Sequence, residues 1–311
     1  HQWYDAYADM ITWTKNEDGS WTFDYSVFDR WVEFMMGLGI NKMINCYSLL
    51  TWNNQLHYND MQKKELVTVE LKAQSKEYQA MWSVFLSDFT RHLREKGWLE
   101  ITNIAMDERG PEDMQAALKV LNRYAPELGV SLADNHKSYQ QYPWIKDICV
   151  GAWTTPSQEE ITARREKGLN TTYYVCCSAK FPNTFTFSPS AEAVYLAWHA
   201  VALDLDGFLR WSYNSWVENP LTDSRFRTWP AGDTYIVYPD ARSSIRFERL
   251  VEGIQDVEKI RVLRKAYSEE NSPEAMEKLT KLEEAIKYFD AMEPADDWLE
   301  RLNEAKQLLN S

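Results

Sequence analysis

The sequence predicts an α/β protein with parallel strands, and within that class it favours a (β/α)8 barrel. Short apolar runs alternate with amphipathic stretches of helical length, which is the pattern of strands joined by helices. Six strands can be counted, a number that fits either a barrel lacking two strands or an open doubly wound sheet. Neither GxGxxG nor GxxxxGK(S/T), the phosphate loops of open nucleotide-binding sheets, occurs in the chain, so the barrel is preferred.

The predicted strands are short and mostly apolar. They cover residues 42–48, 101–107, 130–133, 148–153, 171–177 and 207–211. The first predicted helix covers 26–38 and stops at Gly39. The second carries an apolar stripe over 78–93 and stops at Gly97, the residue type that favours a helix end.

Further helices are predicted in both halves of the chain. Pro111 opens a third helix, because proline is well tolerated in the first turn. The stretch 190–205 is apolar almost all round, so we expect a buried helix there. After Pro239 the chain turns helical, over residues 245–267, 273–292 and 295–309.

The domain organisation follows from the absence of a linker. No segment rich in glycine or serine marks a boundary, so we expect one barrel domain over 1–267, incomplete at its N-terminal end. A helical C-terminal extension over 268–311 is expected to pack on it. The charged run 269–284 is typical of a solvated helix face rather than of a partner site.

Composition excludes several kinds of partner and cofactor. The 311 residues carry 34 basic and 47 acidic side chains, for a net charge of -13 with no basic stripe, so nucleic acid is not an expected partner. The long apolar stretch 191–205 is too short to cross a bilayer, so no integral membrane segment is expected. Four scattered cysteines predict no disulfide framework, and five histidines without HExxH or HxH predict neither a metal site nor a cofactor.

Two carboxylates, Asp107 and Glu108, end the predicted strand 101–107. In a (β/α)8 barrel the active site lies at the carboxyl ends of the strands, so this pair is the main candidate for acid–base chemistry. Arg109 and Pro111 follow, in a turn that leads into a helix. From the pattern alone, a solvated turn with Arg109 as the ion-pair partner explains these residues about equally well.

Aromatic and amide side chains cluster after the last predicted strand, at Trp211, Tyr213, Asn214 and Trp216. Flat rings and amide donors suit a sugar with its apolar faces and hydroxyls. The chain holds 14 Trp, 17 Tyr and 12 Phe, although core packing explains most of them. The alternative is that the two tryptophans only plug the barrel mouth. Weaker candidates for substrate binding are Tyr47, Asn135, Trp153, Tyr173 and Tyr174.

Several long blocks of the chain occur in the same order in one known family. They include WTFDYSVFDRWVEFMMGLGI, INCYSLLTWN, IAMDERGPEDM, TTYYVCC, FLRWSYNSWVENPLTDSRF and GDTYIVYPDARSSIRFERLVEGIQD. Together they resemble glycoside hydrolase family 123, the β-N-acetylgalactosaminidases, from about Trp21 to about Arg264. In the last block Asp240 stands where glycine is usual, in a turn.

The resemblance implies an architecture as well as an activity. Family members have an N-terminal β-sandwich and then a (β/α)8 barrel whose fourth strand ends in the catalytic Asp-Glu pair. Because Asp107 and Glu108 end only the second predicted strand, the first two barrel strands are expected upstream of His1. The segment 235–238 then becomes a hairpin beyond the last strand.

The resemblance also implies a mechanism. An exo-acting, retaining enzyme would release terminal β-linked N-acetylgalactosamine from glycans of the glycosphingolipid type, with the 2-acetamido oxygen of the substrate as nucleophile. Glu108 would be the general acid and base, and Asp107 would orient the acetamide and stabilise the oxazolinium. Tyr173 or Tyr174 would hold the acetamido oxygen. The sugar pocket would be formed by Trp211, Asn214 and Trp216.

Two alternatives stay open from the sequence. One is a β-hexosaminidase that prefers N-acetylglucosamine, because the two sugars differ only at O4 and no single residue reports on that hydroxyl. The other is a catalytically silent glycan-binding barrel, against which the intact Asp107 and Glu108 pair argues. Enzymes of this kind are usually exported, so a periplasmic or extracellular location is expected.

Overall fold

The computed structural model describes residues 9–225, 228–293 and 295–310. The chain divides into two compact units, His1–Ile148 and Cys149–Ser311, and the boundary falls inside strand β8 (Asp147–Gly151). Strand β8 therefore contributes residues to both units, and each unit has its own sheet strands and its own covering helices.

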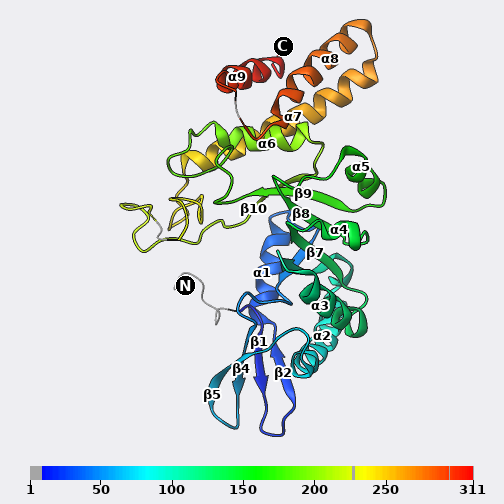
Figure 1. Cartoon of the computed structure of the whole chain (residues 1–311), viewed down its shortest axis with the longest axis vertical. Coiled ribbons are helices and arrows are strands. Elements are labelled where there is room, and N and C mark those ends of the chain that lie inside the picture. Colours follow the sequence, from blue (N-terminus) through cyan, green and yellow to red (C-terminus); the bar gives the residue numbers. More distant parts are fainter. Residues whose placement is uncertain (1–8, 226–227, 294, 311) are drawn as a thin grey trace. The chain divides into compact units, whose positions relative to one another are not determined.

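Unit 1 carries a four-stranded sheet that the sequence pattern did not predict (Figure 1). Its order is β2-β1-β4-β5, with antiparallel pairs β1–β2 and β4–β5 and a parallel pair β1–β4. The strands are β1 (Thr12–Lys15), β2 (Trp21–Asp24), β4 (Gln55–Asp60) and β5 (Glu65–Glu70). Aromatic packing holds β1, because the Trp13 ring stacks on Phe85 at 4.6 Å between centroids.

Unit 1 also holds parallel strands at the predicted positions. They are β3 (Ile44–Tyr47), β6 (Thr102–Asp107) and β7 (Gly129–Asp134), with β8 next in the order. Strand β6 lies parallel to β3 on one side and to β7 on the other, with Asp107 opposite Ala133 in the register. Five of the six residues of β6 are buried, as expected of a central parallel strand.

In the described part of unit 1, four helices and a 3-10 turn accompany these strands, and capping residues mark both ends of the longest helix, α2 (Lys76–Lys96). The other helices are α1 (Ser26–Gly37), α3 (Pro111–Tyr124) and the short α4 (Ser138–Gln141), with a 3-10 turn η1 (Leu99–Ile101). The Ser75 hydroxyl accepts the Tyr78 amide at 3.1 Å and so begins α2. Gly97 ends that helix at φ +74°, a conformation that glycine adopts without strain.

Unit 2 continues the parallel pattern in the order β8-β9-β10. Strands β9 (Asn170–Val175) and β10 (Gly207–Arg210) are parallel, with Tyr173 opposite Phe208. Helix α5 (Gln158–Glu166) precedes β9 and starts in a capping box between Ser157 and Glu160. These strands confirm the sequence prediction to within two residues at each end.

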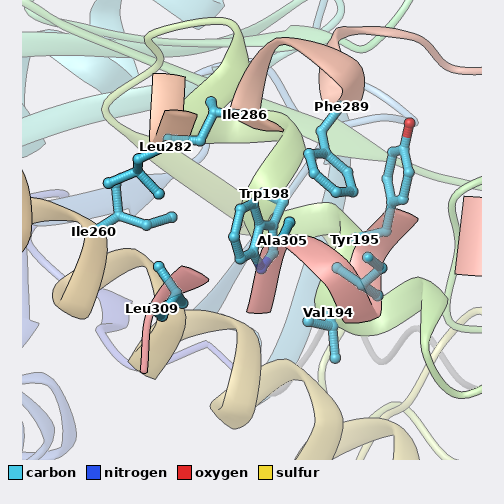
Figure 2. Packing of buried hydrophobic residues seen from close by; sticks show 10 residues of the cluster. Val194, Tyr195, Trp198, Ile260, Leu282, Ile286, Phe289, Ala305 and Leu309 are labelled. Atoms are coloured by element: carbon cyan, nitrogen blue, oxygen red, sulfur yellow. The ribbon is translucent and has the colours of Figure 1, made fainter. Parts of the chain in front are cut away.

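Helices form the core of unit 2 (Figure 2). They are α6 (Glu192–Ala202), α7 (Ile245–Glu270), α8 (Pro273–Lys287), the 3-10 turn η2 (Tyr288–Asp290) and α9 (Trp298–Leu308). Trp198 of α6 is fully buried among side chains of α7, α8 and α9. The expectation that 190–205 holds a buried helix is confirmed, because every residue from Glu192 to Ala200 is buried.

Three expectations about the architecture are not settled by the described residues. The described residues give six parallel-sheet strands, so a complete (β/α)8 barrel stays a prediction. The hairpin expected at 235–238 stays a prediction: the segment forms no strand of its own, and its pairing consists of two antiparallel bridges, Tyr235 to Asn214 and Tyr238 to Arg242. The division into 1–267 and 268–311 stays a prediction, although α9 is tied to α7 by Lys306, whose ammonium donates to Asp256 at 2.5 Å.

Glu192 gives unit 2 a pH-dependent stability that can be measured. Its carboxylate accepts the Asn183 amide at 2.8 Å, and burial raises the pKa of Glu192 to about 7 from an ordinary 4.5. The folded state therefore binds a proton that the unfolded chain has lost, so stability falls as pH rises from about 4.5 to about 7.

We expect Glu192→Gln to flatten this fall. Urea unfolding followed at pH 5 and pH 7.5 should show that the wild type loses about 1 to 3 kcal/mol more unfolding free energy over this interval than the variant does. Equal losses in the two proteins would contradict a proton held by Glu192 in the fold.

Candidate active site

The backbone turns sharply between the two candidate carboxylates. Strand β6 ends at Asp107, and Glu108 has φ +41°, in the left-handed region that non-glycine residues rarely adopt. The Glu108 amide donates to the Ala133 carbonyl at 2.9 Å, which fixes the turn against β7. Neighbouring residues in a continuing strand point to opposite faces, and this turn removes that constraint from the pair.

Asp107 is held from a distant loop. The Trp52 indole N–H donates to Asp107 Oδ2 at 2.9 Å. The Arg109 guanidinium lies 4.0 Å from the centroid of the Trp52 ring and donates to the Leu50 carbonyl at 3.2 Å. Two residues of the 107–109 turn thus contact the loop that joins β3 to β4.

The electrostatics of Asp107 reflect its partial burial. Burial raises the pKa of this carboxyl above its ordinary value, and the negative charge of Glu108 raises it further. The hydrogen bond from Trp52 and the positive charge of Arg109 lower the pKa, so they favour the ionised form. Burial thus disfavours the ionised form of Asp107, whereas Trp52 and Arg109 stabilise it.

A cavity of about 650 Å³ opens beside Asp107 within unit 1. Tyr47, Trp52 and Asp107 are among the residues that line it, so the structure brings the predicted Tyr47 and Asp107 to one cavity. The Tyr47 side chain is 58% exposed, at the carboxyl end of β3. Apolar side chains also line the cavity, including Met10, Met35, Met36, Ile40 and Met43. The volume is of the size that binds small ligands.

The predicted Asn135 follows the carboxyl end of β7, the strand next to β6. Its Oδ1 is buried, and so is Oδ2 of Asp134, and neither atom has a hydrogen-bond partner among residues that the structure describes. The other Asp134 oxygen accepts the His136 amide at 2.9 Å and the Ser138 hydroxyl at 3.0 Å. A buried acceptor without a hydrogen bond lowers the stability of the fold, so such atoms are often found where a ligand supplies the missing donor.

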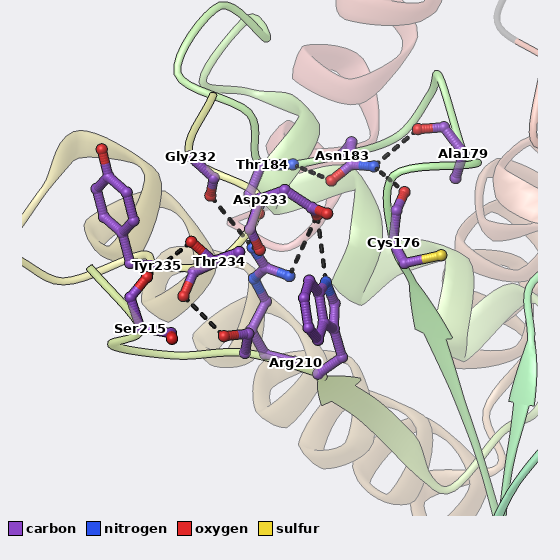
Figure 3. A network of polar contacts seen from close by, with 12 residues as sticks. Cys176, Ala179, Asn183, Thr184, Arg210, Ser215, Gly232, Asp233, Thr234 and Tyr235 are labelled. Atoms are coloured by element: carbon purple, nitrogen blue, oxygen red, sulfur yellow. Dashed lines mark hydrogen bonds and ion pairs between the residues drawn. The ribbon is translucent and has the colours of Figure 1, made fainter. Parts of the chain in front are cut away.

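The segment after β10 is anchored to a second segment of unit 2, where the Thr234 hydroxyl donates to the Ser215 carbonyl at 2.7 Å (Figure 3). The Trp211 indole donates to Asp233 Oδ1 at 3.2 Å, and the Trp216 indole donates to the Val237 carbonyl at 2.8 Å. Asn214 bridges to Tyr235. Tyr213 and Trp216 remain 48% and 38% exposed, so their rings are accessible.

Sequence reasoning missed the buried pair beneath this cluster, Arg210 and Asp233. Arg210 Nη1 lies 3.9 Å from Asp233 Oδ1, and Nη2 donates to the carbonyls of Gly232 and Asp233. Burial lowers the pKa of Arg210 to about 10, although the charge of Asp233 opposes this shift. The only signal available was that Asp233 opens the block GDTYIVYP and Arg210 ends an apolar run.

The three remaining predicted residues, on or near β9, divide between core and surface. Tyr173 is fully buried and its hydroxyl donates to the Leu196 carbonyl at 2.6 Å, so the structure gives no support to a substrate contact there. Tyr174 is buried, with Trp153 packed edge-on against it at 5.7 Å. Trp153 is 50% exposed and is the accessible member of the three.

A metal centre and a membrane-spanning helix are both absent from residues 9–225, 228–293 and 295–310. Among these residues no group of three or more His, Cys, Asp or Glu side chains is placed to hold a metal ion. Within the same part of the chain, no helix combines the length and the apolar character that crossing a bilayer requires.

Two adjacent carboxylates thus stand at the end of a buried parallel strand, and Asp107 lines a cavity beside it. Comparison with known proteins gives the class to which this domain belongs. Residues 1–263 match the model of the catalytic domain of glycoside hydrolase 123. The chain therefore belongs to glycoside hydrolase family 123.

A solved structure from the same family agrees with that assignment. A family 123 glycoside hydrolase from Clostridium perfringens, studied for glycolipid glycan hydrolysis, is 30% identical with a TM-score of 0.83. The match covers 99% of this chain and 58% of that one, so the chain spans less than two thirds of that relative's length.

Other comparisons add little. A GH10 xylanase with a bacterial Ig-like domain, from termite gut, reaches a TM-score of 0.43 at 15% identity, over 81% of this chain and 68% of that one, and carries no argument about the fold. No curated protein matches the sequence.

Proposed function

We propose that the protein is an exo-acting, retaining β-N-acetylgalactosaminidase that uses substrate-assisted catalysis. The observation that carries the proposal is the Asp107 and Glu108 pair at the carboxyl end of β6 in a family 123 domain, with Asp107 lining a cavity. The glycolipid glycans on which the Clostridium perfringens relative was studied suggest terminal β-GalNAc of glycolipids as the substrate. We also propose that the enzyme works outside the cytoplasm, where such glycans are met.

Two steps account for retention at the anomeric carbon. The 2-acetamido oxygen attacks that carbon while the bond to the leaving oxygen breaks, and Glu108 donates its proton to the leaving group. Asp107 accepts the acetamide N–H and stabilises the positive charge of the oxazolinium. Glu108 then takes a proton from water, and the water oxygen attacks the anomeric carbon from the face where the leaving group had been. This attack breaks the bond between that carbon and the acetamido oxygen and opens the oxazolinium ring.

The geometry of the pair suits these separate roles. Asp107 has one oxygen on the Trp52 indole, which leaves the other for the acetamide. Glu108 sits one residue further, beyond the end of the strand and in the left-handed turn, so its side chain does not have to follow the alternation of β6. No nucleophile from the protein is required, because the substrate supplies its own.

The test compares two aryl glycosides that differ only at O4. We expect aryl β-GalNAc to be hydrolysed at least about 100-fold faster than aryl β-GlcNAc, as kcat/KM, because a site that bonds one hydroxyl leaves buried groups unpaired with its epimer. Equal or reversed rates would point to a β-hexosaminidase. A complete lack of turnover with both would favour a glycan-binding barrel.

A further inference from the structure

The loop between β3 and β4 is built to present Trp52. Its bends are fixed internally, since the Ser48 hydroxyl donates to the Leu50 carbonyl at 2.8 Å and the Thr51 hydroxyl to the Gln55 carbonyl at 2.9 Å. Helix α2 anchors it from below, because the Tyr78 hydroxyl donates to the Leu49 carbonyl at 2.7 Å. Leu49 and Leu50 are buried, whereas the Trp52 ring is 50% exposed and its N–H points at Asp107.

Arg109 closes the arrangement from the other side. It stacks on the Trp52 ring and donates to the Leu50 carbonyl, so one side chain restrains both the ring and its loop. A guanidinium over an indole face is a favourable cation–π contact, and a planar guanidinium stacks better than a lysine ammonium does. Arg109 lies two residues after Asp107, so its contacts connect the loop that carries Trp52 to the 107–109 turn.

We propose that Trp52, backed by Arg109, is a positioning residue that occupies Oδ2 of Asp107 and leaves Oδ1 to the acetamide N–H of the substrate. The proposal rests on the function proposed above for Asp107. A carboxylate without the indole partner is free to rotate about its terminal torsion, and then neither oxygen is reserved for the substrate. Trp52 thus acts through Asp107 rather than on the reacting atoms.

The same contact has a second consequence, in the ionisation of Asp107. The charged groups that act on this carboxyl in the described structure are Glu108, which raises its pKa, and Arg109, which lowers it. Because the indole hydrogen bond also lowers the pKa, its removal moves the pKa upward. The ionised form is the one that accepts the acetamide N–H, so the acidic limb of the rate profile moves to higher pH.

Trp52→Phe removes the N–H and keeps an aromatic ring for Arg109. We expect kcat on aryl β-GalNAc to fall about 10- to 100-fold with little change in KM, and the acidic limb of the pH profile to move to higher pH. Trp144→Phe is the matched control, since Trp144 is a 46% exposed tryptophan of the same unit that packs on Tyr142, and it should follow the wild type.

Arg109→Lys keeps a positive charge and loses the planar stack, so it gives a second test if the first variant does not fold. We expect a several-fold loss of kcat in the same direction. Wild-type kcat and an unmoved acidic limb in either folded variant would overturn the proposal.

A readout without turnover separates this proposal from the function on which it rests. If the wild type hydrolyses no aryl β-GalNAc, the proposed function fails, and the carboxyl carbon of Asp107 can still be titrated by NMR. A higher pKa in Trp52→Phe than in the wild type supports the contact that positions Asp107. The same pKa in both proteins overturns it.

Discussion

Glu108→Gln should slow release of GalNAc from a natural oligosaccharide by about 10² to 10⁴-fold, because a sugar alkoxide leaves poorly without a proton. An activated aryl glycoside, such as a dinitrophenyl one, needs no proton for departure, so the first step should lose much less. Rates for both substrates, measured in the wild type and in the variant, check this. Glu112→Gln, at an exposed carboxylate in the first turn of α3, is the control and should leave both rates unchanged.

The neighbouring carboxylate provides the contrast. Asp107→Asn should be costly with both leaving groups, because the oxazolinium charge and the orientation of the acetamide matter whatever departs. If Glu108→Gln loses equally with both substrates while Asp107→Asn depends on the leaving group, the two roles assigned here are exchanged.

The parallel strands could be predicted because burial on both faces leaves a plain apolar run. Strand β6 contains the apolar run 104–106, and its end at Asp107 was predicted to the residue. The four-stranded sheet was not predicted, because its strands are short and half-exposed and mix polar with apolar residues. These strands are β1, β2, β4 and β5. Their stability comes from tertiary contacts such as Trp13 on Phe85, which no local pattern shows.

The candidate site was predictable only in part, for a related reason. Asp107 and Glu108 stand out by their place after a buried strand, whereas Trp52 lies 55 residues away in a loop. The parallel pairing of β3 with β6 brings Trp52 to Asp107, and sequence spacing does not reveal that pairing.

The sequence could not show which of Tyr173 and Tyr174 belongs to the core and which lies beside Trp153. Successive side chains point to opposite faces, so one tyrosine meets α6 through Leu196 and the other meets Trp153. Two adjacent tyrosines look alike in a sequence, and the face that each occupies is decided by the helix that covers the sheet.

The central claim is that the substrate supplies the nucleophile, and one comparison tests it most directly. Aryl β-GalNAc and aryl β-galactoside share the leaving group and the O4 configuration, and they differ in the 2-acetamido group. We predict that the galactoside reacts at least about 10³-fold more slowly in kcat/KM, because removal of an intramolecular nucleophile forfeits a large effective concentration. Comparable rates for the two substrates would contradict substrate assistance and point to an enzymic nucleophile.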